Sequence, residues 1–128
     1  MRILLDTHIF LWALFEPTKL SSSLAKMYQD RQNTFFLSLV SIWEIQIKLQ
    51  LGKLTFDIDL QQVIMEQIDL GYIEILSIKL EHILNIQSLP FHHKDPFNRL
   101  LISQAIIEDL FLASSDSMIS AYSVRSIH

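Results

Sequence analysis

Short apolar, β-rich runs alternate with longer segments of helical periodicity along this chain, and this alternation limits the fold more than any other feature. Four runs predict strands, at residues 2–5, 34–37, 72–76 and 111–113, and residues 123–127 predict a last strand at an edge. Strands separated by helices pair in parallel, because each helix returns the chain across a face of the sheet. The sequence therefore predicts an α/β protein with a mostly parallel sheet covered on both faces.

The segments between these runs have the periodicity and the end signals of helices. Pro17 and Pro90 follow two of them, Gly52 and Gly71 end two others, and Pro96 opens the clearest one. The predicted helices cover residues 8–16, 21–32, 41–52, 59–71, 79–89 and 96–109, with one or two further turns at 118–122. No repeat, low-complexity tract or linker separates them. We therefore expect a single domain over residues 1–128.

The composition narrows the class of protein. The chain of 128 residues contains no cysteine, which excludes disulfides, thiolate chemistry and cysteine-based zinc sites. The apolar run at its start is too short for a signal peptide, and no apolar stretch is long enough to span a bilayer. We therefore expect a cytoplasmic protein with no membrane partner.

Hydrophobic residues are abundant for a small domain. They make up 50% of the chain, and the mean hydropathy is +0.30. This surplus predicts an apolar protein interface, and a symmetric homodimer is the commonest closed assembly. We expect such a homodimer, with the helices that begin near Pro17 and Ser41 as candidates for its interface. The net charge is −4, so any RNA contact is expected to be local or transient.

Four short polar segments place an acid or an amide where an apolar run gives way to a helical pattern. They contain Asp6, Glu44, the pair Asp95 and Asn98, and Asp116. In an open α/β sheet, such strand ends and helix starts meet at the edge where ligands bind. Carboxylates gathered there raise one another's pKa unless a cation neutralises them, and oxygen ligands favour Mg²⁺ or Mn²⁺ over zinc. The four segments therefore predict one metal site.

The segments around these residues resemble the PIN domain of the VapC-like toxin type, the ribonuclease of bacterial and archaeal toxin–antitoxin pairs. The matching stretches are, in the family's order, LLDTHIFLWAL at 4–14, SIWEIQIK at 41–48 with LGKL at 51–54, HHKDPFNRLLISQA at 92–105 and LASSD at 112–116. Together they span nearly the whole chain. The resemblance implies a PIN-like three-layer α/β/α sandwich with a central, mostly parallel sheet of four or five strands.

The resemblance also implies a Mg²⁺- or Mn²⁺-dependent endoribonuclease, which cleaves RNA phosphodiester bonds with metal-activated water and is silenced by a cognate antitoxin protein. Asp6, Glu44 and Asp116 match three of the family's acids. The family's next helix usually begins Asp-Pro-Phe-Asp, whereas this chain has Asn98 at the last of those positions. An amide oxygen can bind Mg²⁺, but it brings no charge and is no general base. Asp95 lies three residues earlier on the same helical face and is expected to reach the metal or a water beside it.

The same residues also fit helix-capping roles. Asp95 followed by Pro96 has the pattern of an N-cap, Ser41 and Glu44 have the spacing of a capping box, and Asp116 is a plausible cap of a short helix. Each of these patterns taken alone favours the capping role. Four acid-bearing helix starts in the family's order favour a shared metal site.

Other residues are candidates for contact with the substrate. Lys48 lies one turn from Glu44, and Arg99 is next to Asn98, so each is a candidate phosphate contact, with a solvated helix face as the alternative. Ser114 is a candidate for orienting a water, with the hydroxyl of an ordinary turn as the alternative.

Two further functions fit the same set of residues. The missing acid at Asn98 also fits a catalytically weakened PIN-like module that binds or regulates without turnover. Metal-dependent phosphatase or DNase chemistry would use the same ligands, because a fold alone does not set the substrate. The histidine pair His92 and His93 lacks the spacing of a zinc site and is expected in a loop, where a secondary role near the substrate is open.

Overall fold

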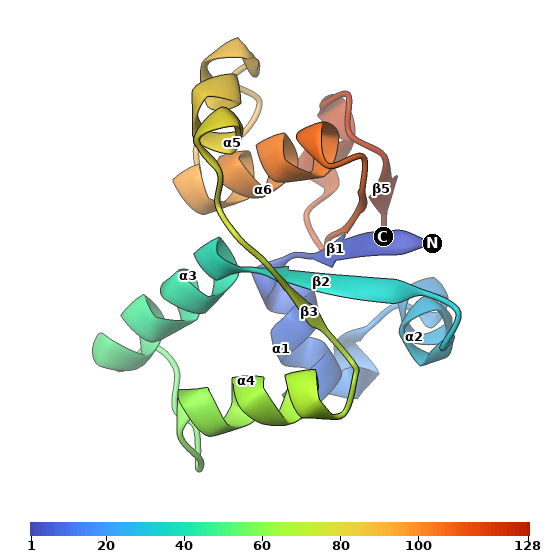
Figure 1. Ribbon diagram of the computed structural model, residues 1–128, viewed down its shortest axis with the longest axis vertical. Helices are drawn as coiled ribbons and strands as arrows, with labels where there is room; N and C mark the ends of the chain where they lie inside the picture. Colours follow the sequence, from blue (N-terminus) through green and yellow to red (C-terminus); the bar gives the residue numbers. More distant parts are fainter.

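A five-stranded parallel sheet lies at the centre of the computed structural model, which describes residues 1–128 (Figure 1). Its strands are β1 (Arg2–Leu5), β2 (Thr34–Ser38), β3 (Glu74–Leu76), β4 (Phe111–Ala113) and β5 (Ser126–Ile127). Their order is β3-β2-β1-β4-β5, and every neighbouring pair is parallel. The predicted sheet is therefore confirmed, with β5 at an edge as expected.

The predicted helices are present, most of them with slightly different ends. They are α1 (Thr7–Phe15), α2 (Ser22–Gln29), α3 (Leu39–Gln50), α4 (Leu60–Asp69), α5 (Leu80–Leu84) and α6 (Pro96–Ile107), with 3₁₀ turns η1 (Pro17–Lys19), η2 (Asn85–Ser88) and η3 (Ser117–Ala121). Gly52 and Gly71 have positive φ angles of 72° and 75°, and this left-handed conformation, which suits glycine, ends α3 and α4 as predicted. No helix of the chain has both the length and the apolar character that crossing a membrane requires.

One helix start differs from its prediction in a way that matters for the site. Ser38 caps α3, because its hydroxyl accepts the N–H of Val40 at 3.1 Å, so the helix begins at Leu39 rather than at Ser41. The capping-box interpretation of Ser41 and Glu44 is therefore wrong. Glu44 lies in the second turn of α3, where its carboxylate is not needed to close the helix.

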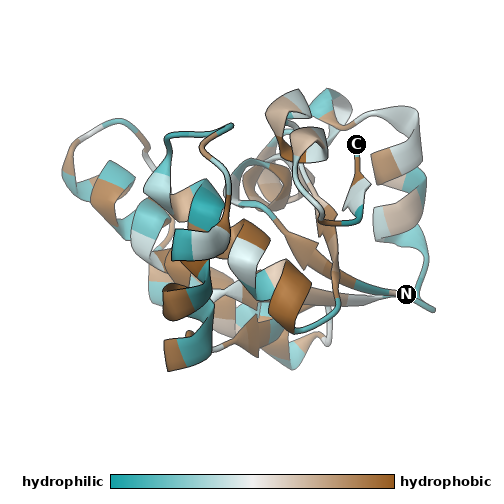
Figure 2. Ribbon diagram, turned by 90° about the horizontal axis from the view of Figure 1, so that it is seen from above, coloured by the Kyte–Doolittle hydropathy of each residue, from teal (hydrophilic) through white to brown (hydrophobic).

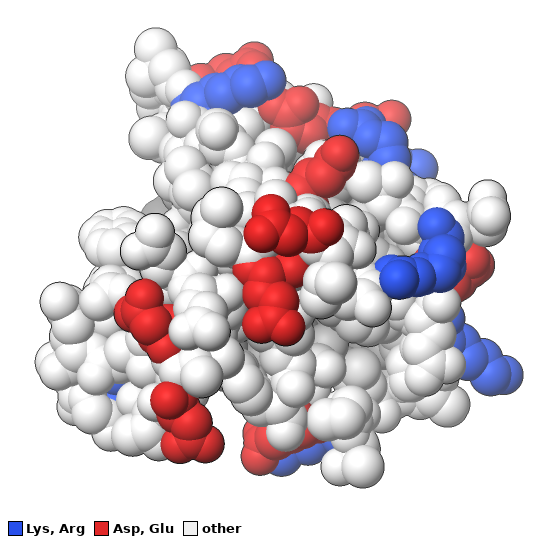
Figure 3. All heavy atoms as spheres, turned by 60° about the horizontal axis from the view of Figure 1, so that its bottom comes forward, with Lys and Arg blue, Asp and Glu red and all other residues white.

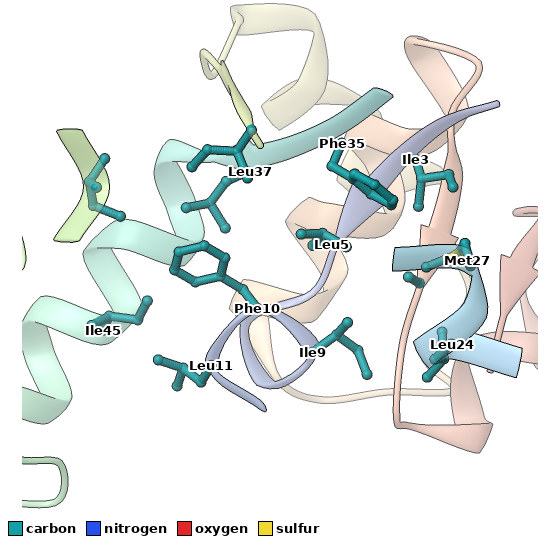
Figure 4. Close-up of a cluster of buried hydrophobic side chains, with 13 residues drawn as sticks. Ile3, Leu5, Ile9, Phe10, Leu11, Leu24, Met27, Phe35, Leu37 and Ile45 are labelled. Atoms are coloured by element: carbon teal, nitrogen blue, oxygen red, sulfur yellow. The ribbon is translucent and has the colours of Figure 1, made fainter. Parts of the chain in front are cut away.

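The central strand is buried on both faces, which gives the molecule its three layers. Ile3 and Leu5 of β1 pack with residues of α1, α2, α3 and α4 in one cluster (Figure 4), whereas Leu4 between them packs with α6 and η3 in a second cluster. Successive side chains of a strand point to opposite faces, so a strand covered on both sides is apolar throughout. In Figure 2 the central strands are mostly brown, the colour of hydrophobic residues. Figure 1 shows helices on both sides of the sheet.

Candidate active site

The candidate site begins at Asp6, which follows the central strand β1 directly. Only 4% of its surface is exposed. Oδ1 accepts the N–H of Ile9 at 2.8 Å and so caps α1, while Oδ2 accepts the N–H of Ser115 at 3.3 Å. Burial raises the pKa of the Asp6 carboxyl, and these hydrogen bonds offset only part of that effect. A cation beside Asp6 would stabilise its charged form.

A polar hollow of about 450 Å³ opens beside Asp6, and no hydrophobic side chain lines it. Its lining consists of Asp6, His8, His93, Asp95, Asn98, Ser115, Asp116 and Ser117. The structure thus brings Asp6, Asp95, Asn98 and Asp116 to one place from segments that are far apart in the sequence. Glu44, the remaining predicted ligand, is not part of the lining.

Glu44 is tied to this region through its neighbours. Its Oε1 accepts the hydroxyl of Thr7 at 2.7 Å, and Thr7 directly follows Asp6 in the chain. Its Oε2 forms an ion pair of 3.0 Å with Lys48, and Glu44 is only 7% exposed. The charge of Lys48 is therefore paired with Glu44 in this structure. Glu44 would have to exchange that partner to act as a metal ligand.

Asp116 begins the turn η3 after β4. Its Oδ1 accepts the N–H of Met118 at 2.9 Å, which confirms the capping role, and its own N–H is bound by the buried Ser114 hydroxyl at 3.0 Å. Burial pushes the pKa of Asp116 upward, but the bonds from Met118 and His93 outweigh it and hold that pKa below its ordinary value. Ser114 therefore has the turn role that was its alternative, and it shapes the segment that carries Asp116.

Asp95 and Asn98 come from the start of α6. Oδ1 of Asp95 accepts the N–H groups of Phe97 and Asn98 at 2.8 and 3.3 Å, which confirms Asp95 as the N-cap. Its Oδ2 takes no protein hydrogen bond. One carboxylate oxygen thus caps the helix while the other is available to the hollow, so the capping and ligand roles of Asp95 are compatible.

His93 is the residue of the site whose importance the sequence did not indicate. Its Nε2 lies 2.5 Å from Oδ2 of Asp116 and 3.2 Å from the side-chain amide of Asn98, and its Nδ1 accepts the backbone N–H of Asp95 at 3.0 Å. Because Nδ1 accepts this hydrogen bond, the ring proton of the neutral form lies on Nε2, which donates a hydrogen bond to Asp116. His93 thus connects the start of α6 to η3 across the hollow.

Arg99 does not face the hollow, and its predicted contact with substrate phosphate does not fit the structure. The residue is only 5% exposed, and its guanidinium lies 4.2 Å from the centre of the Phe91 ring. It donates to backbone carbonyl groups of the segment before α6, namely those of Ile86, Leu89, Pro90 and His93. Arg99 follows Asn98 directly in the sequence, and no sequence pattern indicates that the segment before α6 folds over its side chain. Its role is to hold the loop that carries His93.

A second group of ionisable side chains lies outside the hollow. Ligand atoms of Glu81, His82 and Glu108 lie within 4.8 Å of one another, which is closer than any three acids of the hollow. Lys79 already supplies positive charge there, since its ammonium is 3.1 Å from Oε1 of Glu108, and the buried His82 donates to the same oxygen at 2.9 Å. These bonds lower the pKa of Glu108, with His82 as the largest cause. The group is an ion-pair network that ties α5 to the end of α6.

The donors around the hollow fit a divalent cation. Three carboxylates, an amide and the backbone and hydroxyl groups of Ser115 and Ser117 are oxygen donors of the kind that Mg²⁺ and Mn²⁺ prefer. No lysine or arginine lines the hollow to neutralise these carboxylates.

Comparison with known proteins identifies one family. The sequence model of the PIN domain matches residues 3–124. No curated protein sequence matches the chain.

Several solved structures share the fold at low sequence identity. The chain is similar to VapBC2 from Rickettsia felis bound to a DNA fragment from its promoter, with a TM-score of 0.71, 16% identity, and coverage of 99% of this chain and 98% of that chain. It is similar to FitAcB from Neisseria gonorrhoeae, with a TM-score of 0.65, 17% identity, and coverage of 98% and 96%. It is also similar to VapBC-1 from nontypeable Haemophilus influenzae, with a TM-score of 0.61, 14% identity, and coverage of 99% and 97%.

Replacing Arg99 by Ala should destabilise the protein by about 2–4 kcal/mol, because it removes a buried side chain and the donor to one buried and three partly buried carbonyl groups. Urea denaturation measures the change in the free energy of unfolding. The matched control is Arg125→Ala, since Arg125 is 52% exposed and pairs with the exposed Asp109, a contact worth less than about 1 kcal/mol. Equal losses in the two variants would contradict the structural role of Arg99.

Replacing His93 by Ala should raise the pKa of Asp116, because the substitution removes one of the bonds that favour the carboxylate. Carbon-13 NMR titration of the Asp116 side chain in metal-free protein measures this shift. A depressed folded-state pKa stabilises the fold above the unfolded-state pKa and loses that contribution as the pH falls through the folded value. The stability difference between parent and variant should therefore shrink in acid.

The control for this titration is His92→Ala. The His92 ring packs 5.1 Å from the Tyr122 ring and makes no bond to Asp116. A shift of the Asp116 pKa in this variant as large as in His93→Ala would mean that loss of loop structure, and not of the His93 bond, changes the carboxyl group.

Proposed function

Because this chain belongs to the PIN domain family, we propose that it is a Mg²⁺- or Mn²⁺-dependent endoribonuclease of the cytoplasm and the toxin of a toxin–antitoxin pair. PIN domains are generally nucleases, so hydrolysis of a phosphodiester bond is the activity that the family favours. The observation that carries the proposal is the polar hollow, in which carboxylates from the end of β1 and the starts of α6 and η3 meet without a lysine or arginine.

The residues of the hollow have distinct tasks in this proposal. Asp6 is held by N–H groups on both of its oxygens, so its position is fixed before any ligand binds. Asp116 is oriented by the N–H of Met118 and by His93. Asp95 offers the oxygen that α6 does not use.

Glu44 belongs to the proposed site as the acid that accepts the Thr7 hydroxyl, and it would exchange its ion pair with Lys48 for the metal. A bound divalent ion would supply positive charge that activates a water and offsets the charge that develops on the phosphate. Asn98 contributes an amide oxygen in place of a carboxylate. We therefore expect weaker metal binding than in a site made of acids only.

An antitoxin protein is the proposed natural partner. The similar solved structures are VapBC and FitAB assemblies, and both VapBC2 from Rickettsia felis and a further FitAB structure are bound to DNA fragments. An acidic hollow with no lysine or arginine in its lining is complementary to a basic side chain inserted by such a partner.

A second function is favoured by one observation, the neutral side chain of Asn98 at the start of α6. Without that fourth charge in the hollow, the chain fits a module that keeps its partner contacts but has lost turnover. Metal-dependent phosphatase or DNase chemistry is distinguished from RNA cleavage only by the substrate.

Replacing either Asp6 by Asn or Asp116 by Ala should reduce cleavage of single-stranded RNA by about two orders of magnitude or more, because each change removes a proposed metal ligand. The assay uses purified protein free of antitoxin in Mg²⁺ or Mn²⁺, with EDTA, single-stranded DNA and a phosphomonoester as controls. Calorimetric titration of Mn²⁺ should show weaker binding to Asp6→Asn than to the parent protein. Cleavage that survives EDTA and both substitutions would exclude this site.

Replacing Asn98 by Asp tests the second function. The added charge should strengthen Mn²⁺ binding and increase the rate of RNA cleavage. If the parent binds RNA without cutting it and only Asn98→Asp cuts, the chain is a binding module and not a nuclease. Cleavage by both proteins supports the nuclease.

We also propose a homodimer, for which the helices beginning near Pro17 and Ser41 were the expected interface. The structure favours α3 as the dimer interface, because two of its large apolar side chains are exposed one turn apart. Leu39 is 41% exposed and Trp43 is 59% exposed. Light scattering should give twice the 14.9 kDa mass of the chain, and Trp43→Glu should shift the protein toward the monomer. A monomer at micromolar concentration in the parent protein would refute the dimer.

A further inference from the structure

A second and larger depression adjoins the polar hollow. It has a volume of about 660 Å³ and lies between α1 and the segment that follows α3. We call it the aromatic groove, and its residues used below are His8, Trp12, Phe15, Lys48, Lys53 and Phe56. His8 lines both depressions, so the groove and the site that carries Asp6 are neighbours at this residue.

We propose that the aromatic groove binds the single-stranded RNA segment next to the phosphodiester bond that is cut. This inference rests on the proposed function, since it names where the substrate of that site lies. An RNA strand cleaved in its interior must leave the catalytic hollow on both sides. The groove that shares His8 with the hollow is the neighbouring depression into which one of those sides would pass.

The aromatic rings are arranged along this path. The rings of His8 and Trp12, one helical turn apart on α1, have centres 6.2 Å apart. Farther along, the ring of Phe15 packs 4.9 Å from that of Phe56, and Phe15 is 48% exposed. Aromatic rings at the surface of a groove are platforms on which unpaired bases stack, at about 1–3 kcal/mol per base.

The charges of the groove suit a phosphate backbone. Lys53 is exposed and forms no ion pair, and Lys48 pairs only with Glu44. The acid of the groove, Glu16, is already paired with Lys19 at 3.0 Å. Lys53 thus supplies unpaired positive charge in the groove, although the chain as a whole carries −4.

This positive charge is local. Figure 3 shows a face of the molecule on which acidic side chains gather near the middle while lysine and arginine lie toward the margins. A groove with the unpaired Lys53 beside an acidic hollow would hold the RNA next to the cut bond, while the hollow would hold the metal. A protein segment would gain less from such a groove, because its backbone carries no regular negative charge for the lysines to meet.

The binding experiment uses the full chain in EDTA, so that no cleavage occurs. Fluorescence anisotropy of a labelled single-stranded oligouridine measures the affinity of the parent, of Lys53→Glu and of the matched control Lys26→Glu, which reverses an exposed charge on α2. Lys53→Glu should weaken binding about tenfold or more and lower the slope of log affinity against log salt by about 0.7 or more. Lys26→Glu should leave both values close to those of the parent.

A second measurement tests stacking directly. In a Trp43→Phe background Trp12 is the one tryptophan left, and its fluorescence should be quenched when the oligouridine binds. Phe15→Ala should weaken this binding about fivefold or more. Undiminished fluorescence at saturation would overturn the stacking arrangement, and with it the proposal.

The outcomes for the groove and for the catalytic function are separate. If the parent cleaves RNA but Lys53→Glu and Phe15→Ala bind oligouridine as the parent does, the groove assignment is overturned and the nuclease stands. If the groove variants lose binding while no protein cleaves, the groove is supported and the nuclease fails. Failure of the parent to bind the oligonucleotide would also overturn the groove and leave it as a face for protein docking.

Discussion

The burial of the Asp6 carboxylate is the constraint on which the rest of the site depends. Asp6 is buried because it directly follows β1, which is covered on both faces. A buried carboxylate is costly unless hydrogen bonds or a cation compensate it. Here the N–H groups of Ile9 and Ser115 compensate it in part, and by doing so they fix α1 and the end of β4 relative to each other. The burial of Asp6 therefore accounts both for the order of these two segments and for a carboxylate that a cation would stabilise.

Much of this organisation could be predicted from the sequence, because it depends on local patterns. Apolar runs located the strands, glycines located two helix ends, and the sheet-edge argument brought Asp6, Asp95 and Asp116 together. The start of α3 was misplaced because both Ser38 and Ser41 are good capping residues, and only the surrounding fold selects Ser38.

The parts that escaped prediction depend on contacts between distant segments. His93 becomes part of the site only because η3 places Asp116 against its ring. Arg99 becomes buried only because the loop before α6 folds over the helix and directs its carbonyl groups inward. Neither arrangement leaves a periodic signal in the sequence, since loop conformation is set by non-local hydrogen bonds. A histidine pair and a lone arginine were therefore assigned to solvent or substrate by default.

The set of bonds around Arg99 has a further consequence for the energy of ligand capture. The loop that presents His93 would otherwise sample many conformations, and ordering it on binding would cost about 1–2 kcal/mol for each residue fixed. The hydrogen bonds of Arg99 order that loop during folding, so its conformational entropy is lost before any ligand binds. An ion of the kind proposed for the hollow would then meet a His93 loop that is already ordered, and a larger share of its interaction energy would appear as affinity.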